Sequence, residues 1–157
     1  DQGLGWLLLN AIAHEAHMRE HFTRAITAAG IGAVLVVAIL LASKSSADLF
    51  RIAWCLHQLY GLPIALACGA CAVGLRPLYA QLALLLVGIV ALWISLYLGL
   101  DAGFRALQES ANPPAEAFAD GGPMMGALFL GWLPAAWIVG IAFLASHYHA
   151  RRTGHRA

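Results

Sequence analysis

The sequence predicts an all-α membrane protein with four transmembrane helices in an antiparallel up-down bundle, preceded by a short interfacial helix. Of its 157 residues, 61% are hydrophobic and only 11% are charged, whereas soluble domains contain about 45–50% apolar and about 25% charged residues. The mean hydropathy is +0.76, and the charged residues lie in short segments between four long charge-free stretches. These observations exclude a soluble monomer. The net charge of +1 is too small for a nucleic-acid-binding protein.

Residues 1–22 do not fit the pattern of a membrane span. The apolar run at residues 3–13 is shorter than the roughly 20 residues that a spanning helix needs, and it is followed by histidine, glutamate and arginine side chains. We predict an interfacial N-terminal helix at the cytoplasmic surface. A cleavable signal peptide is not expected, because the basic residues follow the apolar run instead of preceding it. Since the chain begins at Asp1, the run is alternatively the end of a fifth span that starts upstream.

Residues 23–150 form the predicted membrane domain. An ionised side chain at the centre of a bilayer costs about 2.5–3.5 kcal/mol, so each span must lie within a charge-free stretch. Each stretch is long enough for one span, at about 1.5 Å per residue, and none comfortably holds two. Short turns connect the first three spans, which favours antiparallel neighbours. The predicted spans lie near residues 25–43, 52–75, 78–100 and 124–147.

Proline and glycine mark the expected loop and bends. Between the third and fourth spans, residues 101–123 contain Asn-Pro-Pro and Gly-Gly-Pro sequences on either side of an acidic stretch, so we predict one long loop there. Gly131 together with Pro134 should bend the fourth span, and Pro63 should bend the second. The bundle should therefore contain two bent helices.

The cationic residues predict how the bundle is threaded. Four spans place both termini on one side, and most of the cationic residues lie on that side. The positive-inside rule then puts both termini in the cytoplasm. Arginine outnumbers lysine, and alanine and glycine are abundant, which suggests a bacterial genome of high GC content, so we expect a bacterial inner-membrane protein. Residues 151–157 form a basic tail that should bind anionic headgroups. The terminal side carries Arg19, Arg24, Arg76, Arg151, Arg152 and Arg156, and the opposite side carries Lys44, Arg51 and Arg105.

Three histidines near the N-terminus form the first candidate site. His14, His17 and His21 recur at i, i+3 and i+7, so they fall on one face of a helix. Three imidazoles on one face can bind zinc or copper, with a fourth ligand from the histidine-rich C-terminal segment. The alternative is a set of interfacial histidines paired with nearby glutamates and lipid phosphates. We favour this alternative, because the stretch lacks the histidine spacing of a zinc-protease helix.

His57 lies inside the second predicted span and is the second candidate. An ionisable group within a membrane is a functional-site hypothesis by default. As an axial ligand of haem, His57 would need a partner at similar depth, and as part of a polar site it would bind a substrate or a quinone. The third interpretation, which we favour, is a hydrogen bond between helices. In that case its ring should meet Ser95 or Tyr97 of the third span.

Cys68 and Cys71 form a CxxC pattern in the middle of the second span. Reactive CxxC pairs lie at exposed helix N-termini, so redox chemistry is not expected here. Small residues surround the two cysteines, and Gly69 and Gly74 should let a neighbouring helix approach closely. The pattern therefore indicates helix packing.

The sequence contains no phosphate-binding loop, no nucleophile elbow and no pair of carboxylates within a span. We therefore expect a non-catalytic accessory or scaffolding subunit of a larger membrane complex, whose partners are membrane lipids and other membrane-protein subunits or further copies of itself. The alternatives are a small oligomeric transporter or channel and a metal- or haem-binding redox subunit. No cofactor is predicted, although zinc, copper or haem would suit the histidine sites.

Overall fold

The structure, a computed structural model, describes residues 2–42, 48–75, 77–109 and 122–154, with side chains described for all of these except 2–14, 16, 17, 48, 122, 153 and 154. The described residues form five α-helices and no strand, which confirms the all-helical prediction. The helices are α1 (Gln2–Leu41), α2 (Asp48–Ala72), α3 (Leu78–Gln108), α4 (Gly122–Leu130) and α5 (Trp132–Gly154).

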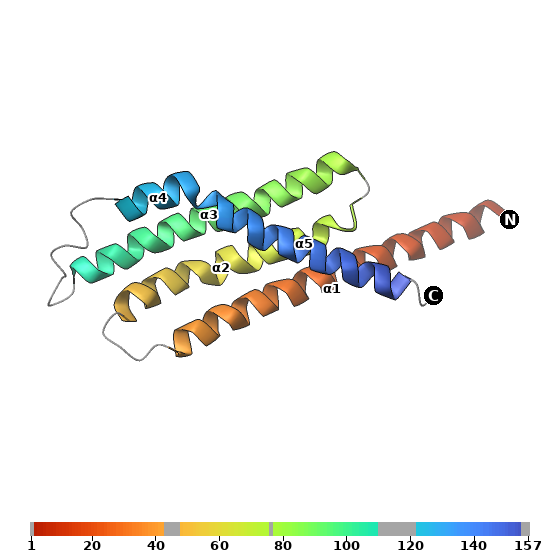
Figure 1. Cartoon of the computed structure of the whole chain (residues 1–157). Coiled ribbons are helices and arrows are strands. Elements are labelled where there is room, and N and C mark those ends of the chain that lie inside the picture. The colour runs from red at the N-terminus through yellow and green to blue at the C-terminus, as the bar shows by residue number, and fades with distance from the viewer. Residues whose placement is uncertain (1, 43–47, 76, 110–121, 155–157) are drawn as a thin grey trace.

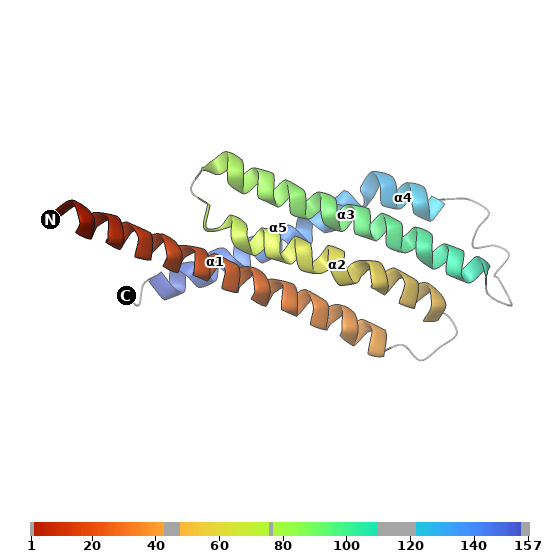
Figure 2. The same cartoon turned by 180° about the vertical axis from the view of Figure 1, so that it is seen from behind.

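The three longest helices lie side by side in one layer, with α2 in the middle (Figures 1 and 2). The shorter helix α5 crosses one face of this layer and packs against both α2 and α3. Successive long helices run in opposite directions, and both ends of the described chain lie at the same end of the molecule (Figure 1). Helix α2 is therefore the central helix, with α1, α3 and α5 packed around it.

Three described helical segments are long and apolar enough to cross a membrane: Met18–Leu41, Leu49–Ala72 and Leu78–Gln108. Helices α4 and α5 satisfy the same criterion only as a pair, with a bend of 46° between them. The described part of the chain therefore has three such spans, or four if the bent pair is one span. This agrees with a multi-pass membrane protein.

Helix α1 is continuous, and it joins two segments that the sequence analysis separated. The predicted interfacial helix at residues 1–22 and the predicted span at 25–43 belong to one helix from Gln2 to Leu41, while residues 1 and 43 lie outside the described residues. Polar side chains in the first half of the helix do not interrupt it, because they are compatible with helical geometry. The surface position of residues 2–22 stays a prediction.

Helix α3 is longer than the predicted span at 78–100. It continues past Asp101 to Gln108, and the Asp101 carboxylate forms an ion pair with Arg105 at 2.6 Å, one turn later in the same helix. Opposite charges at i, i+4 favour a helix, so the charge that ended the predicted span does not end the helix. At the other end, Gln81 Nε2 donates to the Leu75 carbonyl at 2.6 Å, which ties the start of α3 to the residues that follow α2.

The fourth predicted span is broken at Gly131, as expected from Gly131 and Pro134. A Cβ atom on Gly131 would lie 2.3 Å from the carbonyl oxygen of Ala127, so only glycine fits this position. The indole Nε1 of Trp93 on α3 donates to the same carbonyl at 2.9 Å and ties the break to the bundle. Pro134 has no backbone N–H, so one of the helical hydrogen bonds is missing close to the break. In contrast, α2 runs through Pro63 as one helix.

Small residues bring the helices close together. A Cβ atom on Gly69 would lie 2.7 Å from the Val139 carbonyl oxygen of α5, so the prediction that Gly69 faces another helix is confirmed. Small residues also predominate among the buried residues of α3, where one leucine is the exception. The buried residues of α3 are Gly88, Leu92, Ser95, Gly99 and Gly103. Close contact between backbones, as expected for membrane helices, therefore dominates the α2 interfaces.

Candidate functional site

A polar cluster joins α2 to α3. Gln58 is 3% exposed, and its Nε2 donates to the backbone carbonyl of Ser95 at 3.0 Å. Ser95 is fully buried, and its Oγ donates to the backbone carbonyl of His57 at 2.7 Å. A Cβ atom on Gly61 would lie 2.2 Å from Ser95 Oγ, so the glycine makes room for the serine. Two hydrogen bonds thus cross one closely packed interface.

The imidazole ring of His57 takes part in neither of the two hydrogen bonds between α2 and α3. It is half-buried, and its Nδ1 lies 2.6 Å from the hydroxyl of Tyr60, one turn later in α2. The expectation that the ring meets Ser95 or Tyr97 is therefore wrong. The physical reason is the turn of about 100° per residue in a helix, which directs Gln58 toward α3 and leaves His57 to contribute its backbone carbonyl. Cofactor binding by His57 stays a prediction.

The histidine stripe lies on α1, but the side chains of His14 and His17 are outside the described residues. The ring of His21 fills the space beside Gly74, where a Cβ atom would lie 1.4 Å from its Cε1. Cys71 Sγ also donates to the backbone carbonyl of His21, at 3.6 Å. His21 and Cys71 therefore contribute to the packing of α1 on α2. Among the described side chains, no group of three or more His, Cys, Asp or Glu residues could hold a metal ion.

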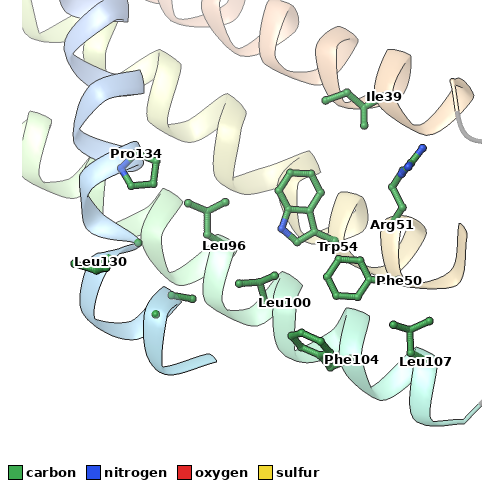
Figure 3. A pocket seen from close by; sticks show the side chains of 13 residues that line it. Ile39, Phe50, Arg51, Trp54, Leu96, Leu100, Phe104, Leu107, Leu130 and Pro134 are labelled. Carbon is green, nitrogen blue, oxygen red and sulfur yellow. The ribbon is translucent and has the colours of Figure 1, made fainter. Parts of the chain in front are cut away.

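A large apolar groove opens at the end of the bundle away from the termini. Its volume is about 960 Å³, and it lies among α2, α3, α4 and the start of α5, with the end of α1 at its border. Figure 3 shows aromatic rings from α2 and α3 on one side and α4 with the start of α5 on the other. We call this space the apolar groove. Its walls include Phe50, Trp54, Leu100, Phe104, Leu130 and Pro134.

Aromatic rings and glycines pack closely together in the walls of the apolar groove. The rings of Phe50 and Phe104 meet edge to face, with centroids 5.3 Å apart. Gly103 makes this possible, because a Cβ atom there would lie 2.6 Å from the Phe50 ring. On the opposite wall, Gly126 leaves open space, with nothing within 4 Å of a Cβ atom. Arg51 lies at the border of the groove, beside the end of α1 (Figure 3).

A second, more polar groove of about 530 Å³ lies at the end of the bundle that carries the termini. We call it the terminal groove. Helices α1 and α5 form its walls, and Ala70 of α2 contributes to its floor. Its polar side chains include Arg24, which forms an ion pair with Glu20 on the same helix. Other lining residues are Thr27, Ile31, Ser146 and His149.

Sequence reasoning singled out His57 within a candidate span but predicted neither groove. Gln58 and Arg24 were visible as polar residues in or beside apolar stretches, which was the available signal. Which helix faces they occupy depends on the packing of neighbouring helices. No family profile, curated protein or solved structure matches this chain. The candidate sites therefore rest on the geometry of the described residues: two grooves that can bind apolar or amphiphilic partners, and a polar cluster that fastens α2 to α3.

Proposed function

We propose that this protein is a non-catalytic accessory or scaffolding subunit of a larger assembly in a bacterial inner membrane. It works by binding an apolar helix of another membrane-protein subunit in the apolar groove. The observation that carries the proposal is the groove itself, which offers about 960 Å³ between four helices with almost entirely apolar walls.

The composition of the walls supports a helix as the occupant. Trp54, Phe50 and Phe104 are large, rigid rings, and aromatic side chains of this kind are enriched at protein interfaces. Gly126 and Gly131 line the opposite wall, and small residues let the backbone of a second helix approach closely. A binding site for a flexible acyl chain has no need of such close backbone approach.

The proposed threading has four spans, with α4 and α5 crossing together as one bent span and both termini in the cytoplasm. The charged residues at the two ends of the bundle support this orientation. Among the described residues, the end with the termini carries Arg19, Arg24, Arg151 and Arg152, and the opposite end carries Arg51 and Arg105.

The polar residues of α2 and α3 support a structural role within this subunit. Gln58 and Ser95 bond to backbone carbonyls across the interface, and His57 bonds to Tyr60. A transporter or channel would line its path with such groups, and a redox subunit would direct them toward a cofactor. The bonds of Gln58 and Ser95 instead hold α2 and α3 together, and the bond between His57 and Tyr60 lies within α2, which favours a scaffold over both alternatives.

The proposal is tested by filling the groove. Gly126→Leu places a side chain in open space within the groove, and Gly140→Leu is a matched control, because a Cβ atom there also has nothing within 4 Å and Gly140 does not line the groove. Complexes extracted from the native membrane in mild detergent are separated by native electrophoresis. The wild type and Gly140→Leu should migrate as an assembly much larger than the 16.6 kDa chain, and Gly126→Leu should be released from it.

A photoreactive residue in place of Leu130 identifies the occupant. Leu130 is 60% exposed and lines the groove, so cross-linking followed by peptide mass spectrometry should yield a transmembrane segment of another protein. Cross-links to lipid alone, or an assembly that survives Gly126→Leu unchanged, would contradict the proposal. Cross-links to the same chain would replace the accessory subunit with a homo-oligomer.

A further inference from the structure

The terminal groove has a graded polarity that follows the length of α1. Its lining residues on α1 recur at spacings of three and four, from Glu20 through Arg24 and Thr27 to Ile31, so they share one helix face. Arg24 and Ile31 are seven residues apart, which corresponds to about 10 Å along the helix axis. The groove is therefore charged at the end near the termini and apolar nearer the middle of the bundle.

The opposite wall follows the same gradient. On α5, His149 lies nearer the C-terminus than Ser146 and Ala145, and α5 runs toward the same end of the molecule as the start of α1 (Figure 1). The floor is Ala70, which is 2% exposed and small. A molecule in this groove would meet polar groups at one end and alanine and isoleucine side chains at the other.

The hydrogen-bond donors of the terminal groove favour an anion. The hydroxyls of Thr23 and Thr27 donate to the carbonyls of Arg19 and Thr23, at 2.9 and 2.8 Å, so their protons are used within α1. The guanidinium of Arg24 has five N–H donors, and its ion pair with Glu20 involves one of its two terminal nitrogens. Arg24 can therefore hold a carboxylate and a phosphate oxygen at the same time.

The surroundings of the groove add positive charge. Arg19 precedes it on α1, and Arg151 and Arg152 follow it on α5, where the Arg152 guanidinium lies 4.6 Å from the Tyr148 ring centroid. The described carboxylates at this end are Glu15 and Glu20. An anionic group that approaches the groove is therefore attracted, and basic pockets between membrane helices are known to bind anionic headgroups.

We propose that the terminal groove binds one anionic phospholipid, with its phosphate at Arg24 and His149 and an acyl chain along Ile31, Ala70 and Ala145. The charge at one end and the apolar surface at the other match the two parts of such a lipid. The bound lipid fills the space between α1 and α5, and so completes the packing of α1 against the bundle. This proposal is independent of the proposed function, because the apolar groove lies at the opposite end of the molecule.

The test uses the purified full-length chain in detergent. Native mass spectrometry measures the binding of phosphatidylglycerol, which is anionic, and of phosphatidylcholine, which has no net charge, with identical acyl chains. Wild type should bind one phosphatidylglycerol about tenfold more tightly than phosphatidylcholine. Arg24→Gln should remove most of this preference and weaken phosphatidylglycerol binding about tenfold.

Two further variants separate a binding effect from a folding defect. Glu20→Gln removes the carboxylate that competes for Arg24, so it should strengthen phosphatidylglycerol binding about threefold. Arg105→Gln is the matched control, because Arg105 also forms an i, i+4 ion pair but lies at the opposite end of the bundle. This control should bind both lipids as the wild type does.

A steric variant tests the apolar part of the site. Ala145→Leu should lower the affinity for both lipids, since it fills the groove without changing its charge. The proposal is overturned if the wild type binds the two lipids equally, if Arg24→Gln and Arg105→Gln behave alike, or if Glu20→Gln weakens binding. It is also overturned if inorganic phosphate displaces phosphatidylglycerol at equal concentration, because the acyl chain would then contribute nothing.

Discussion

Ser95 uses both its side chain and its backbone to connect α3 to α2. Its hydroxyl donates to the His57 carbonyl, and its own carbonyl accepts the bond from Gln58. Each bond satisfies a polar group where water is absent, which is the requirement for polar groups inside a membrane. Measured interhelical hydrogen bonds in membranes contribute about 0.6 kcal/mol on average and up to about 1.7 kcal/mol.

Gln58 and His57 should therefore respond differently to substitution. Gln58→Leu removes a donor from a buried site and leaves the Ser95 carbonyl without it, so it should lower stability by about 1 kcal/mol or more. His57→Gln leaves the backbone carbonyl in place and should cost less. Thermal unfolding of the purified variants in detergent gives the ranking. A greater loss from His57→Gln would show that the ring of His57 has a role beyond its bond to Tyr60.

The sequence predicted that His57 and Ser95 lie near each other, but it did not predict which of their atoms form the hydrogen bond. His57 was singled out because it is ionisable, and Ser95 was named as a partner at similar depth. Adjacent residues of a helix point about 100° apart, however. The orientation of α2 about its own axis is decided by close contacts of Gly61 with Ser95 on α3 and of Gly99 on α3 with Gln58. That rotation cannot be derived from the positions of polar residues alone.

Helix contacts in this molecule depend on glycines at defined places. At Gly69 the nearest atom to an added Cβ is a backbone carbonyl oxygen of α5, at 2.7 Å, which cannot move without the whole helix. At Gly30 on α1 there is nothing within 4 Å. The two positions lie in long apolar helices, yet only one of them is at a close contact.

Alanine at these two glycines should have opposite effects. Gly69→Ala should lower stability by about 1–3 kcal/mol, as overpacked cores do, and Gly69→Leu should disrupt folding. Gly30→Ala should be neutral or raise stability by up to about 1 kcal/mol, because alanine is the better helix former. Unfolding temperatures in detergent provide the comparison. If Gly69→Ala matched Gly30→Ala, α5 would not lie against α2 as described.

A further prediction concerns the stability of the break between α4 and α5 at Gly131. Gly131→Ala would bring a methyl group onto the Ala127 carbonyl, so it should cost about 1–3 kcal/mol. Trp93→Phe removes only the indole donor to that carbonyl, and about 1 kcal/mol is expected. Because both changes act on one carbonyl, the double variant should lose less than the sum. Additive losses in a double-mutant cycle would mean that the break and the indole bond are independent.

The ends of the helices show where sequence reasoning succeeds and where it stops. Pro77 and the charge-free stretch placed the start of the third helix at Leu78, as found. The same reasoning ended that helix at the first charge, whereas the ion pair of Asp101 with Arg105 lets it continue. The bend in the fourth span followed from Gly131 and Pro134. Pro63 lies within the continuous helix α2, where Gly32 of α1 packs closely against it, and the bend expected there stays a prediction.

For the molecule as a whole, the proposed orientation is tested by cysteine labelling in intact cells. Ala115→Cys lies in the predicted external loop, and Thr153→Cys lies near the C-terminus. An impermeant maleimide should modify the first in intact cells and the second only after permeabilisation, because the cationic residues hold the termini in the cytoplasm. The wild type, whose three cysteines lie in α2, is the background control. The reversed pattern would invert every assignment of sides.

The two grooves are properties of the whole molecule and had no signature in the sequence. Each is formed by residues from at least three helices. Both depend on the oblique crossing of the α1–α3 layer by α5, and α4 contributes to the apolar groove. The sequence shows which aromatic residues are present and predicts the difference in charge between the two ends of the bundle. It could not supply the crossing direction, which follows from the break at Gly131 and the close contact at Gly69.

The central position of α2 has a consequence for biogenesis. Among the described residues of α1, only Gly32 and Val36 are buried, and the main neighbour of α1 is α2. In the proposed four-span threading, α1 enters the membrane before its partner α2 has been made, and the interface between α1 and α2 can form before the more extensive one between α2 and α3. A chain interrupted after α1 would present a lone helix to the quality-control proteases, whereas one interrupted after α3 would already hold α2 packed between α1 and α3.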